Sequence, residues 1–251
     1  MDKQPQENSE KHSDLENKKQ DYLAISLQGL AGMIPVAGNI VAEIIGELIP
    51  NQRTDRIVAF LIKLDEKVAH IEKEALEHKL REKENIDLFE DACFQASRAL
   101  TDEKLEYIAN AFANSLTQDE VAYLYKKKLM WLLGELNENE IIILTNYAYP
   151  HYLGETDDFY EKHREIIYIP TPTLGSSDEE RNEANFKMAF RERLNQLGLI
   201  RPRYKKPRRN EFPEFDFKTG RVEASGFDIT PLGRLLVEFI NQEMEDLDAG
   251  E

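Results

Sequence analysis

The sequence predicts a mainly α-helical protein, in which an N-terminal helical bundle is followed by a small α+β domain. Apolar residues recur at helical spacing through most of the first 149 residues. Residues 150–180 are richer in turn-forming residues, and residues 181–251 mix a helical stripe with short strand-like runs. Together these observations indicate two modules joined by a linker.

The charge of the chain limits what it can bind without a specialised surface. It has 32 basic and 48 acidic residues, which gives a formal net charge of −16. Such a balance keeps a protein soluble and argues against indiscriminate binding to nucleic acid or anionic lipid. Any such binding must therefore come from a local basic patch.

Two features bear on the compartment. Cys93 is the single cysteine and lies in an apolar frame, so an intramolecular disulfide is ruled out and a reducing compartment is expected. Residues 1–21 are polar and of mixed charge, without the apolar run of a signal peptide. We expect a disordered polar arm there and a cytoplasmic protein, with association to the inner membrane as the alternative location.

The stretch from Ile25 to Ile49 differs from the rest of the chain. It contains four glycines and two charged residues, in a protein that is 32% charged. Pro35 divides the stretch into two arms, and Gly38 with its neighbours supplies turn-forming residues. The sequence therefore predicts an apolar helical hairpin over residues 22–49.

Three roles for this hairpin stay open. A single transmembrane helix would be interrupted by Pro35 and Gly38, and Glu43 and Glu47 lie one turn apart near its end. Each arm of about 13 residues reaches only ~20 Å, short of the ~30 Å hydrocarbon core, so insertion would require oligomerisation. Burial in the bundle or in an oligomer interface is slightly favoured. The residues expected at a membrane or oligomer interface are Leu30, Gly32, Ile34, Gly38, Ile40, Ile44, Ile45 and Leu48.

Residues 55–84 are expected to form one amphipathic helix. Its apolar residues follow a four, three, four, three, four spacing, which is the seam of a helix that pairs with another helix. The opposite face carries Glu and Lys. The helix-pairing seam consists of Ile57, Leu61, Leu64, Val68 and Ile71, with Ala75 as its continuation.

Shorter helices complete a bundle over residues 22–149. Thr101 and Thr117 stand where N-caps belong, and Pro150 ends the last helix of this half. Residues 150–180 have two close prolines, serines and one short β-branched run, so we expect a linker or an inserted loop. A helix with an apolar stripe returns at residues 179–197.

Residues 181–251 read as helix, short strand, basic loop, strand, turn and helix. The first helix ends in LGLI at residues 197–200, and the returning strand runs into DITPLGR at residues 228–234. Gly198 permits a left-handed turn, Thr230 can cap the last helix and Pro231 fits its first position. These elements resemble the end of a winged-helix domain, in which a β-hairpin wing lies between the two motifs.

The expected wing contains RPRYKKPRR, a basic run without an acidic residue. Its cations could contact phosphates, with Tyr204 against a sugar or base. If about five of them did so, affinity would fall with salt with a log–log slope of roughly −4 to −5. The alternative, which is somewhat favoured, is a solvated loop or one docked on an acidic surface. The residues for nucleic-acid or acidic-partner binding are Arg201, Arg203, Lys205, Lys206, Arg208 and Arg209.

The helix that would enter the major groove, at residues 180–197, is mixed in charge. It offers Arg181, Asn182 and Lys187 but also Glu180 and Glu183. Base-reading helices instead present donors to base edges and cations to phosphates. We therefore interpret this segment as a poor recognition helix.

Catalytic and cofactor motifs are absent from the sequence. Its five histidines have no metal-ligand spacing with Cys93 or with one another, and no phosphate loop or nucleophile elbow occurs. The acidic run at residues 154–163 is expected by chance in a chain with 48 acidic residues. We expect a non-enzymatic protein without catalytic residues, metal or cofactor.

Several segments resemble bacterial abortive-infection and phage-defence proteins, including the Abi-alpha type. They are PVAGNIVAEIIGELIPNQRTDRIVAFLIKL, ALTDEKLEYIANAF and LLGELNENEIIILTNYA, together with the winged-helix-like ending LGLI and DITPLGRLL. The resemblance implies a non-enzymatic effector or accessory protein that senses infection through one half and acts through the other.

Two functions therefore stay open. In the first, the protein is an antiviral-defence effector whose apolar hairpin oligomerises or acts on the inner membrane. In the second, it is a winged-helix nucleic-acid-binding regulator whose helical half only oligomerises. Both imply a homo-oligomer, and residues 201–209 are the expected contact for a protein partner or a nucleic acid.

Overall fold

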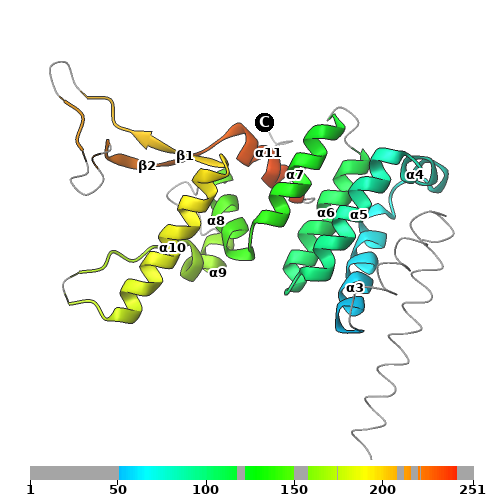
Figure 1. Ribbon diagram of the computed structural model, residues 1–251, viewed down its shortest axis with the longest axis horizontal. Helices are drawn as coiled ribbons and strands as arrows, with labels where there is room; N and C mark the ends of the chain where they lie inside the picture. Colours follow the sequence, from blue (N-terminus) through cyan, green and yellow to red (C-terminus); the bar gives the residue numbers. More distant parts are fainter. Residues whose placement is uncertain are drawn as a thin grey trace, which may run out of the picture. The chain divides into compact units, whose positions relative to one another are not determined.

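The computed structural model describes residues 51–117, 122–149, 158–173, 175–207, 212–215, 220 and 222–241. The expected polar arm, the apolar hairpin at 22–49, Arg208 and Arg209 lie outside these residues. The described part is mainly helical, with a small antiparallel sheet near its C-terminal end (Figure 1). The predicted fold class, mainly α with a small α+β region, is confirmed.

Helices account for most of the described residues, and two strands lie between the last two helices. The helices are α3 (Asn51–Val68), α4 (Lys73–Leu80), α5 (Lys83–Arg98), α6 (Asp102–Thr117), α7 (Tyr123–Glu135), α8 (Glu138–Ala148), α9 (Asp158–Ile167), α10 (Asp178–Gln196) and α11 (Pro231–Ile240). The strands are β1 (Ile200–Tyr204) and β2 (Ala224–Ile229).

The chain divides into two compact units. The N-terminal unit comprises Met1–Gly134 and Phe239–Glu251, and the C-terminal unit comprises Glu135–Glu238. The sequence pattern predicts the end of the bundle at residue 149 and a linker at 150–180. The structure instead groups α8 with the C-terminal unit, because its apolar side chains pack on α9, α10 and β2. Part of the expected linker is helical, since α9 covers Asp158–Ile167.

An aromatic cluster lies at the centre of the N-terminal unit. Helix α3 packs against α5 and α6, which also pack against each other (Figure 1). Phe60, Phe89 and Phe112, one from each helix, are buried; the ring centroids are 6.4 Å apart for Phe60 and Phe89 and 5.3 Å apart for Phe89 and Phe112. Burial of side chains of this size is the main source of stability for such a bundle.

The predicted seam lies on the buried face of α3. Ile57, Leu61, Leu64 and Val68 are all buried there. Ile71 is half-buried, because α3 ends at Val68 and the chain turns with a hydrogen bond from the Ile71 amide to the Val68 carbonyl.

The prediction of a single helix over residues 55–84 is therefore wrong. Helix α4 restarts at Lys73 with a different face, and it buries Leu76 and Leu80 while Ala75 is exposed. A leucine contributes about 2 kcal/mol on burial, more than an alanine can. Breaking the helix lets these two larger side chains reach the core.

Three lysines of the N-terminal unit donate hydrogen bonds to carbonyl groups at helix ends. Lys104 Nζ donates to the Leu133 carbonyl near the end of α7, at 2.6 Å. Lys126 Nζ donates to the Ser115 carbonyl at 2.8 Å, and Lys79 Nζ to the Leu116 carbonyl at 2.6 Å, both at the end of α6. These cations satisfy carbonyls that lack a helical partner and lie at the negative end of the helix dipole.

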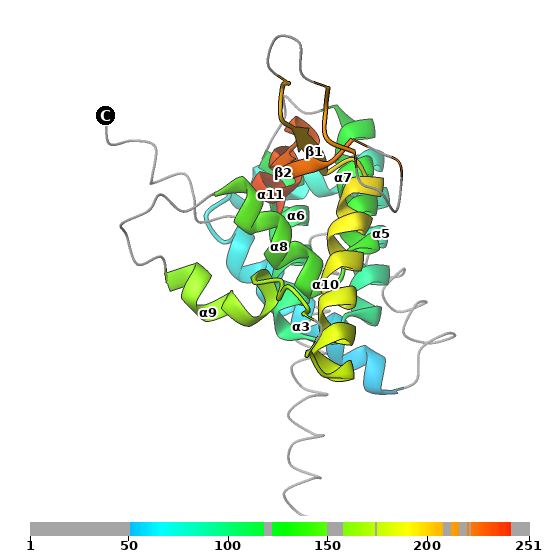
Figure 2. The same cartoon turned by 90° about the vertical axis from the view of Figure 1, so that its left-hand side faces the viewer.

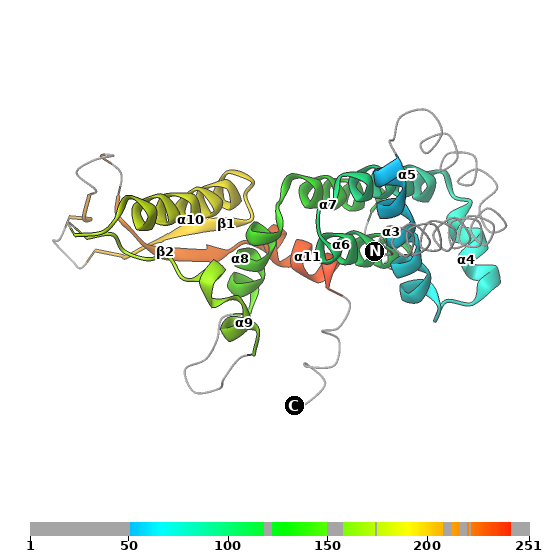
Figure 3. The ribbon, with the colours of Figure 1, turned by 90° about the horizontal axis from the view of Figure 1, so that it is seen from below.

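The C-terminal unit consists of α8, α9, α10, the hairpin of β1 and β2, and the first turns of α11. Helix α8 packs on α9 and α10 (Figure 2). Helix α10 lies along the hairpin and contacts β1 (Figure 3). The core of this unit includes the buried side chains Ala184, Leu194, Leu199, Ile200, Leu236 and Val237.

The two motifs that flank the hairpin bind each other through their backbones. Gly198 has φ 74° and ends α10, with the Leu199 amide donating to the Leu194 carbonyl. Thr230 caps α11 by accepting from the Gly233 amide at 3.0 Å, and its hydroxyl donates to the Gly198 carbonyl at 2.7 Å. The predicted left-handed turn and cap are confirmed, and Pro231 is the first residue of α11 as expected.

Gly233 is required by the same junction. A Cβ atom at this position would lie 2.1 Å from the Leu199 carbonyl oxygen and 2.9 Å from Ile229 Cγ1. The Leu199 carbonyl also accepts a hydrogen bond from the Thr230 amide, so it cannot move away without breaking that bond. The LGLI and DITPLGR motifs thus form one joint at the base of the hairpin.

Candidate nucleic-acid interface

The hairpin has one face toward α10 and one face toward solvent. β1 and β2 are antiparallel, with Pro202 opposite Phe227 and Arg201 opposite Asp228. The Arg191 guanidinium of α10 lies 5.4 Å from the centroid of the Phe227 ring, which fixes the inner face. Because side chains alternate along a strand, Arg201 and Arg203 lie on the outer face.

Cationic side chains are exposed along β1 and just after it. Arg201, Arg203, Lys205 and Lys206 are all exposed. Arg203 forms an ion pair with Asp228 across the strands, with 3.2 Å between its Nη1 and the carboxylate oxygen. We name the described residues of this region, 200–207, 212–215, 220 and 222–229, the basic hairpin.

Three aromatic side chains of the basic hairpin are also exposed. Tyr204 ends β1 after a register irregularity and is 52% exposed. Phe212 is 92% exposed, and Phe215 is 51% exposed at a bridge to Val222. Burial of a phenylalanine normally stabilises a protein by about 2 kcal/mol, so exposed aromatics clustered in one hairpin indicate a contact surface.

The sequence pattern identifies Tyr204 but not Phe212 or Phe215. Both belong to the run EFPEFDF, which also contains Phe217, and its Pro and acidic residues are typical of an ordinary loop. The sequence signal that could have identified these phenylalanines is their closeness to the basic run. Its meaning becomes clear only when the structure places both runs in one hairpin.

Carboxylates are also present in the basic hairpin. Glu214 and Glu223 are exposed and adjacent, since the Glu223 amide donates to the Glu214 carbonyl at 2.8 Å. They belong to the 214–223 part of the hairpin, whereas the four cations lie between Arg201 and Lys206. Among the residues of the hairpin that the structure describes, the cations are thus confined to β1 and the positions directly after it.

Helix α10 presents acidic residues at its N-terminal end. Asp178, Glu179, Glu180 and Glu183 are exposed in its first two turns. Ser177 and Glu180 form a capping box, with the Ser177 hydroxyl accepting from the Glu180 amide at 3.2 Å. These carboxylates stabilise the helix end but repel phosphates, which is unsuitable for a helix that reads DNA bases.

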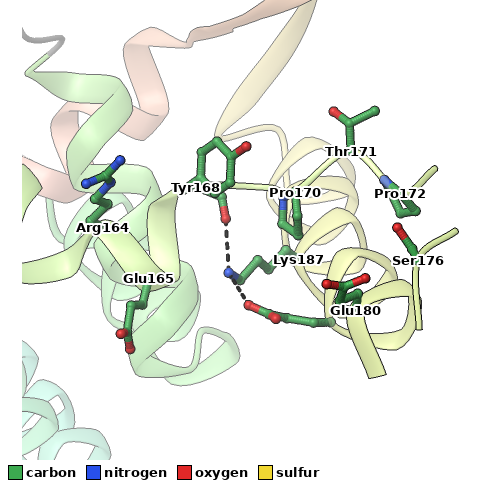
Figure 4. Close-up of a pocket in the computed structure, with 10 residues that line it drawn as sticks. Arg164, Glu165, Tyr168, Pro170, Thr171, Pro172, Ser176, Glu180 and Lys187 are labelled. Carbon is green, nitrogen blue, oxygen red and sulfur yellow. Dashed lines mark hydrogen bonds and ion pairs between the residues drawn. The ribbon is translucent and has the colours of Figure 1, made fainter. Parts of the chain in front are cut away.

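A cavity of about 600 Å³ lies between the end of α9, residues 168–172 with Ser176, and α10. Lys187 lies on its wall; its Nζ donates to the Tyr168 carbonyl at 3.0 Å and pairs with Glu183 at 2.6 Å (Figure 4). Glu180, also on the wall, accepts a hydrogen bond from the Ser177 amide. These polar groups anchor the segment after α9 to α10, so we assign this cavity a structural role.

Three further findings concern metal ligands, the cysteine and membrane spans. Among the described residues, no three His, Cys, Asp or Glu side chains are grouped so that they could hold a metal ion. Cys93 is buried, and burial raises the pKa of its thiol well above the ordinary value, which makes it a weak nucleophile. Within the same described part, the helices lack the length and apolarity needed to cross a membrane. The apolar stretch 25–49 lies outside that search.

The structure brings four of the six predicted basic residues together in one hairpin. Comparison of the chain with protein-family models, curated proteins and solved structures finds no match. The candidate interface therefore rests on the geometry and chemistry of the basic hairpin itself.

Proposed function

We propose that this protein is a non-enzymatic antiviral-defence effector of the abortive-infection type. In this proposal the C-terminal unit contacts nucleic acid through the basic hairpin, and the N-terminal half acts through the apolar residues 25–49. The observation that carries the proposal is the exposure of cationic and aromatic side chains together in the basic hairpin.

The basic hairpin would contact the sugar–phosphate backbone. Arginine and lysine side chains bind phosphate oxygens by charge-assisted hydrogen bonds, and such contacts position a protein without reading sequence. The acidic first turns of α10 disfavour insertion into the major groove. These features support a sensor of nucleic acid over a sequence-specific regulator.

The N-terminal half would respond by assembly or by contact with the inner membrane. This part of the proposal is supported by the sequence, in which residues 25–49 carry two charges and four glycines. Small residues allow close helix approach in oligomers and in lipid. The stretch ends directly before α3, which begins at Asn51.

The nucleic-acid half is tested by a salt titration of full-length protein with a labelled nucleic acid of mixed sequence. We expect affinity to fall steeply with salt, and to fall at least tenfold at low salt when Arg201, Lys205 and Lys206 are changed to Ala. The control is Lys162→Ala in α9, an exposed lysine outside the basic hairpin. Salt-insensitive binding, or equal binding by the charge variant, would overturn the proposal that the basic hairpin binds nucleic acid.

The effector half is tested by separating membrane from cytosol after expression of the intact chain, and by measuring subunit mass in solution. Membrane association or an oligomer that is lost in Ile44→Arg supports the proposal. A wild-type chain that is monomeric and remains in the cytosol contradicts it.

A second candidate is a nucleic-acid-binding regulator whose helical half only oligomerises. The joint between LGLI and DITPLGR favours it, because these motifs resemble the end of a winged-helix domain and Thr230 holds them together at the base of the hairpin. Apart from membrane association, which only the effector predicts, the two functions differ in sequence preference. The regulator requires preference for one duplex sequence over another, whereas the sensor binds without sequence preference.

A further inference from the structure

We infer that the basic hairpin binds single-stranded nucleic acid, with bases stacked on its exposed aromatic side chains. This inference rests on the nucleic-acid-binding half of the proposed function and names the kind of nucleic acid. Two independent observations support it: the three exposed aromatic rings and the acidic end of α10.

The aromatic residues distinguish a single strand from a duplex. In a duplex the faces of the bases are stacked on each other and cannot contact a protein ring. In a single strand each base has a free face, and base–aromatic stacking recurs in proteins that bind single strands without sequence preference. Tyr204, Phe212 and Phe215 are exposed by 52%, 92% and 51% and are available for this contact.

The cations lie where the backbone of such a strand would run. Arg201 and Arg203 lie on the outer face of β1, and Lys205 and Lys206 follow directly after Tyr204. Tyr204 is therefore flanked in sequence by cations on both sides. Such an arrangement suits a strand whose phosphates contact the cations while a base stacks on the Tyr204 ring.

The neighbouring surface is unfavourable for a duplex. A winged helix that reads duplex DNA places its recognition helix in the major groove and its wing against the adjacent backbone. Here that helix begins with Asp178, Glu179 and Glu180, which are exposed. A single strand can follow the hairpin alone and avoid these carboxylates.

The test compares labelled single strands of about 16 nucleotides with a duplex of the same length, using full-length protein and fluorescence anisotropy. Oligo-U and oligo-dT serve as the RNA and DNA probes. We expect at least tenfold tighter binding of one or both single strands than of the duplex. With four phosphate contacts, the log–log salt slope for a single strand is expected to be about −3.

Variants assign the contact to the aromatic rings. Phe212→Ala is expected to weaken single-strand binding about tenfold, and the combined change of Tyr204, Phe212 and Phe215 to Ala should abolish it. Phe212 is so exposed that its loss leaves the fold intact. The matched control is Phe186→Ala, which removes a ring 67% exposed on α10 and should leave binding unchanged.

The outcomes separate this inference from the function on which it rests. Salt-sensitive binding that is equal for single strand and duplex, and equal in Phe212→Ala, overturns the inference and leaves the nucleic-acid half of the proposed function standing. Absence of binding to every probe at low salt overturns both.

Discussion

The core of the N-terminal unit and the basic hairpin of the C-terminal unit use their aromatic and charged residues in opposite ways. In the N-terminal unit Phe60, Phe89 and Phe112 are buried against each other, and Lys79, Lys104 and Lys126 donate to helix-end carbonyls. In the C-terminal unit the basic hairpin exposes both kinds of residue. The buried residues of the N-terminal unit maintain the fold, whereas the exposed residues of the basic hairpin are available for binding.

The largest expected effect comes from the aromatic cluster. Phe89→Ala removes a buried ring that contacts rings on two neighbouring helices, and should lower the free energy of unfolding by about 3–5 kcal/mol. Chemical denaturation followed by circular dichroism measures it. Phe212→Ala in the basic hairpin should change the same quantity by less than about 0.5 kcal/mol. Equal losses would break the distinction between the aromatic core and the basic hairpin.

The second-largest effect on stability is expected at the joint at the base of the hairpin. Gly233→Ala places a Cβ against the Leu199 carbonyl, and should cost about 2–3 kcal/mol in the same denaturation experiment. A Cβ at Gly175 would have no other atom within 4 Å, so Gly175→Ala is the matched control and should be near neutral. A neutral Gly233→Ala would show that the close approach is not needed.

The cap of α11 should have a smaller effect. Thr230→Ala removes the acceptor for the Gly233 amide and the donor to the Gly198 carbonyl, at a cost of about 1–2 kcal/mol. The control is Thr171→Ala in the segment after α9, where the side chain is exposed. If both threonine variants unfold alike, Thr230 does not hold the joint.

The smallest effect, and a pH-dependent one, concerns Glu106 in α6. Burial alone would raise the pKa of this carboxyl, but the hydrogen bonds from Lys67 and Lys63 of α3 outweigh it and hold the pKa below the ordinary value of 4.5. A lowered folded-state pKa means that the ionised form stabilises the fold above pH 4.5, and that this contribution is lost as the pH falls.

Glu106→Gln should therefore lower the free energy of unfolding by about 0.5–1 kcal/mol at neutral pH, and by progressively less below pH 4.5. Unfolding curves recorded across this pH range measure the difference from wild type. Glu66→Gln on the exposed face of α3 is the control. A loss for Glu106→Gln that stays constant on acidification would contradict the ion-pair explanation.

Local rules predict the chemistry of the joint but not its packing. Gly198, Thr230 and Pro231 follow from turn and cap preferences that involve a few neighbouring residues. The need for Gly233 arises from its approach to Leu199, which is distant in sequence. Such contacts between distant residues are not encoded in local propensity.

Periodicity is similarly limited in the N-terminal unit. It identifies the buried face of α3 at Ile57, Leu61, Leu64 and Val68. It does not identify the break after Val68, because that segment contains no Gly or Pro and the burial of Leu76 and Leu80 is decided by tertiary packing. The sequence also does not predict that Phe212 is exposed, since apolar residues are usually expected inside.

The most direct test of the central claim, that the basic hairpin is a binding surface and not part of the stabilising core, is one salt titration. The affinity of full-length protein for a labelled single strand is measured in wild type and in the variant with Arg201, Lys205 and Lys206 changed to Ala. We predict that the variant loses at least tenfold in affinity at low salt and that the log–log slope becomes shallower by about 2. An unchanged affinity and slope would contradict the account.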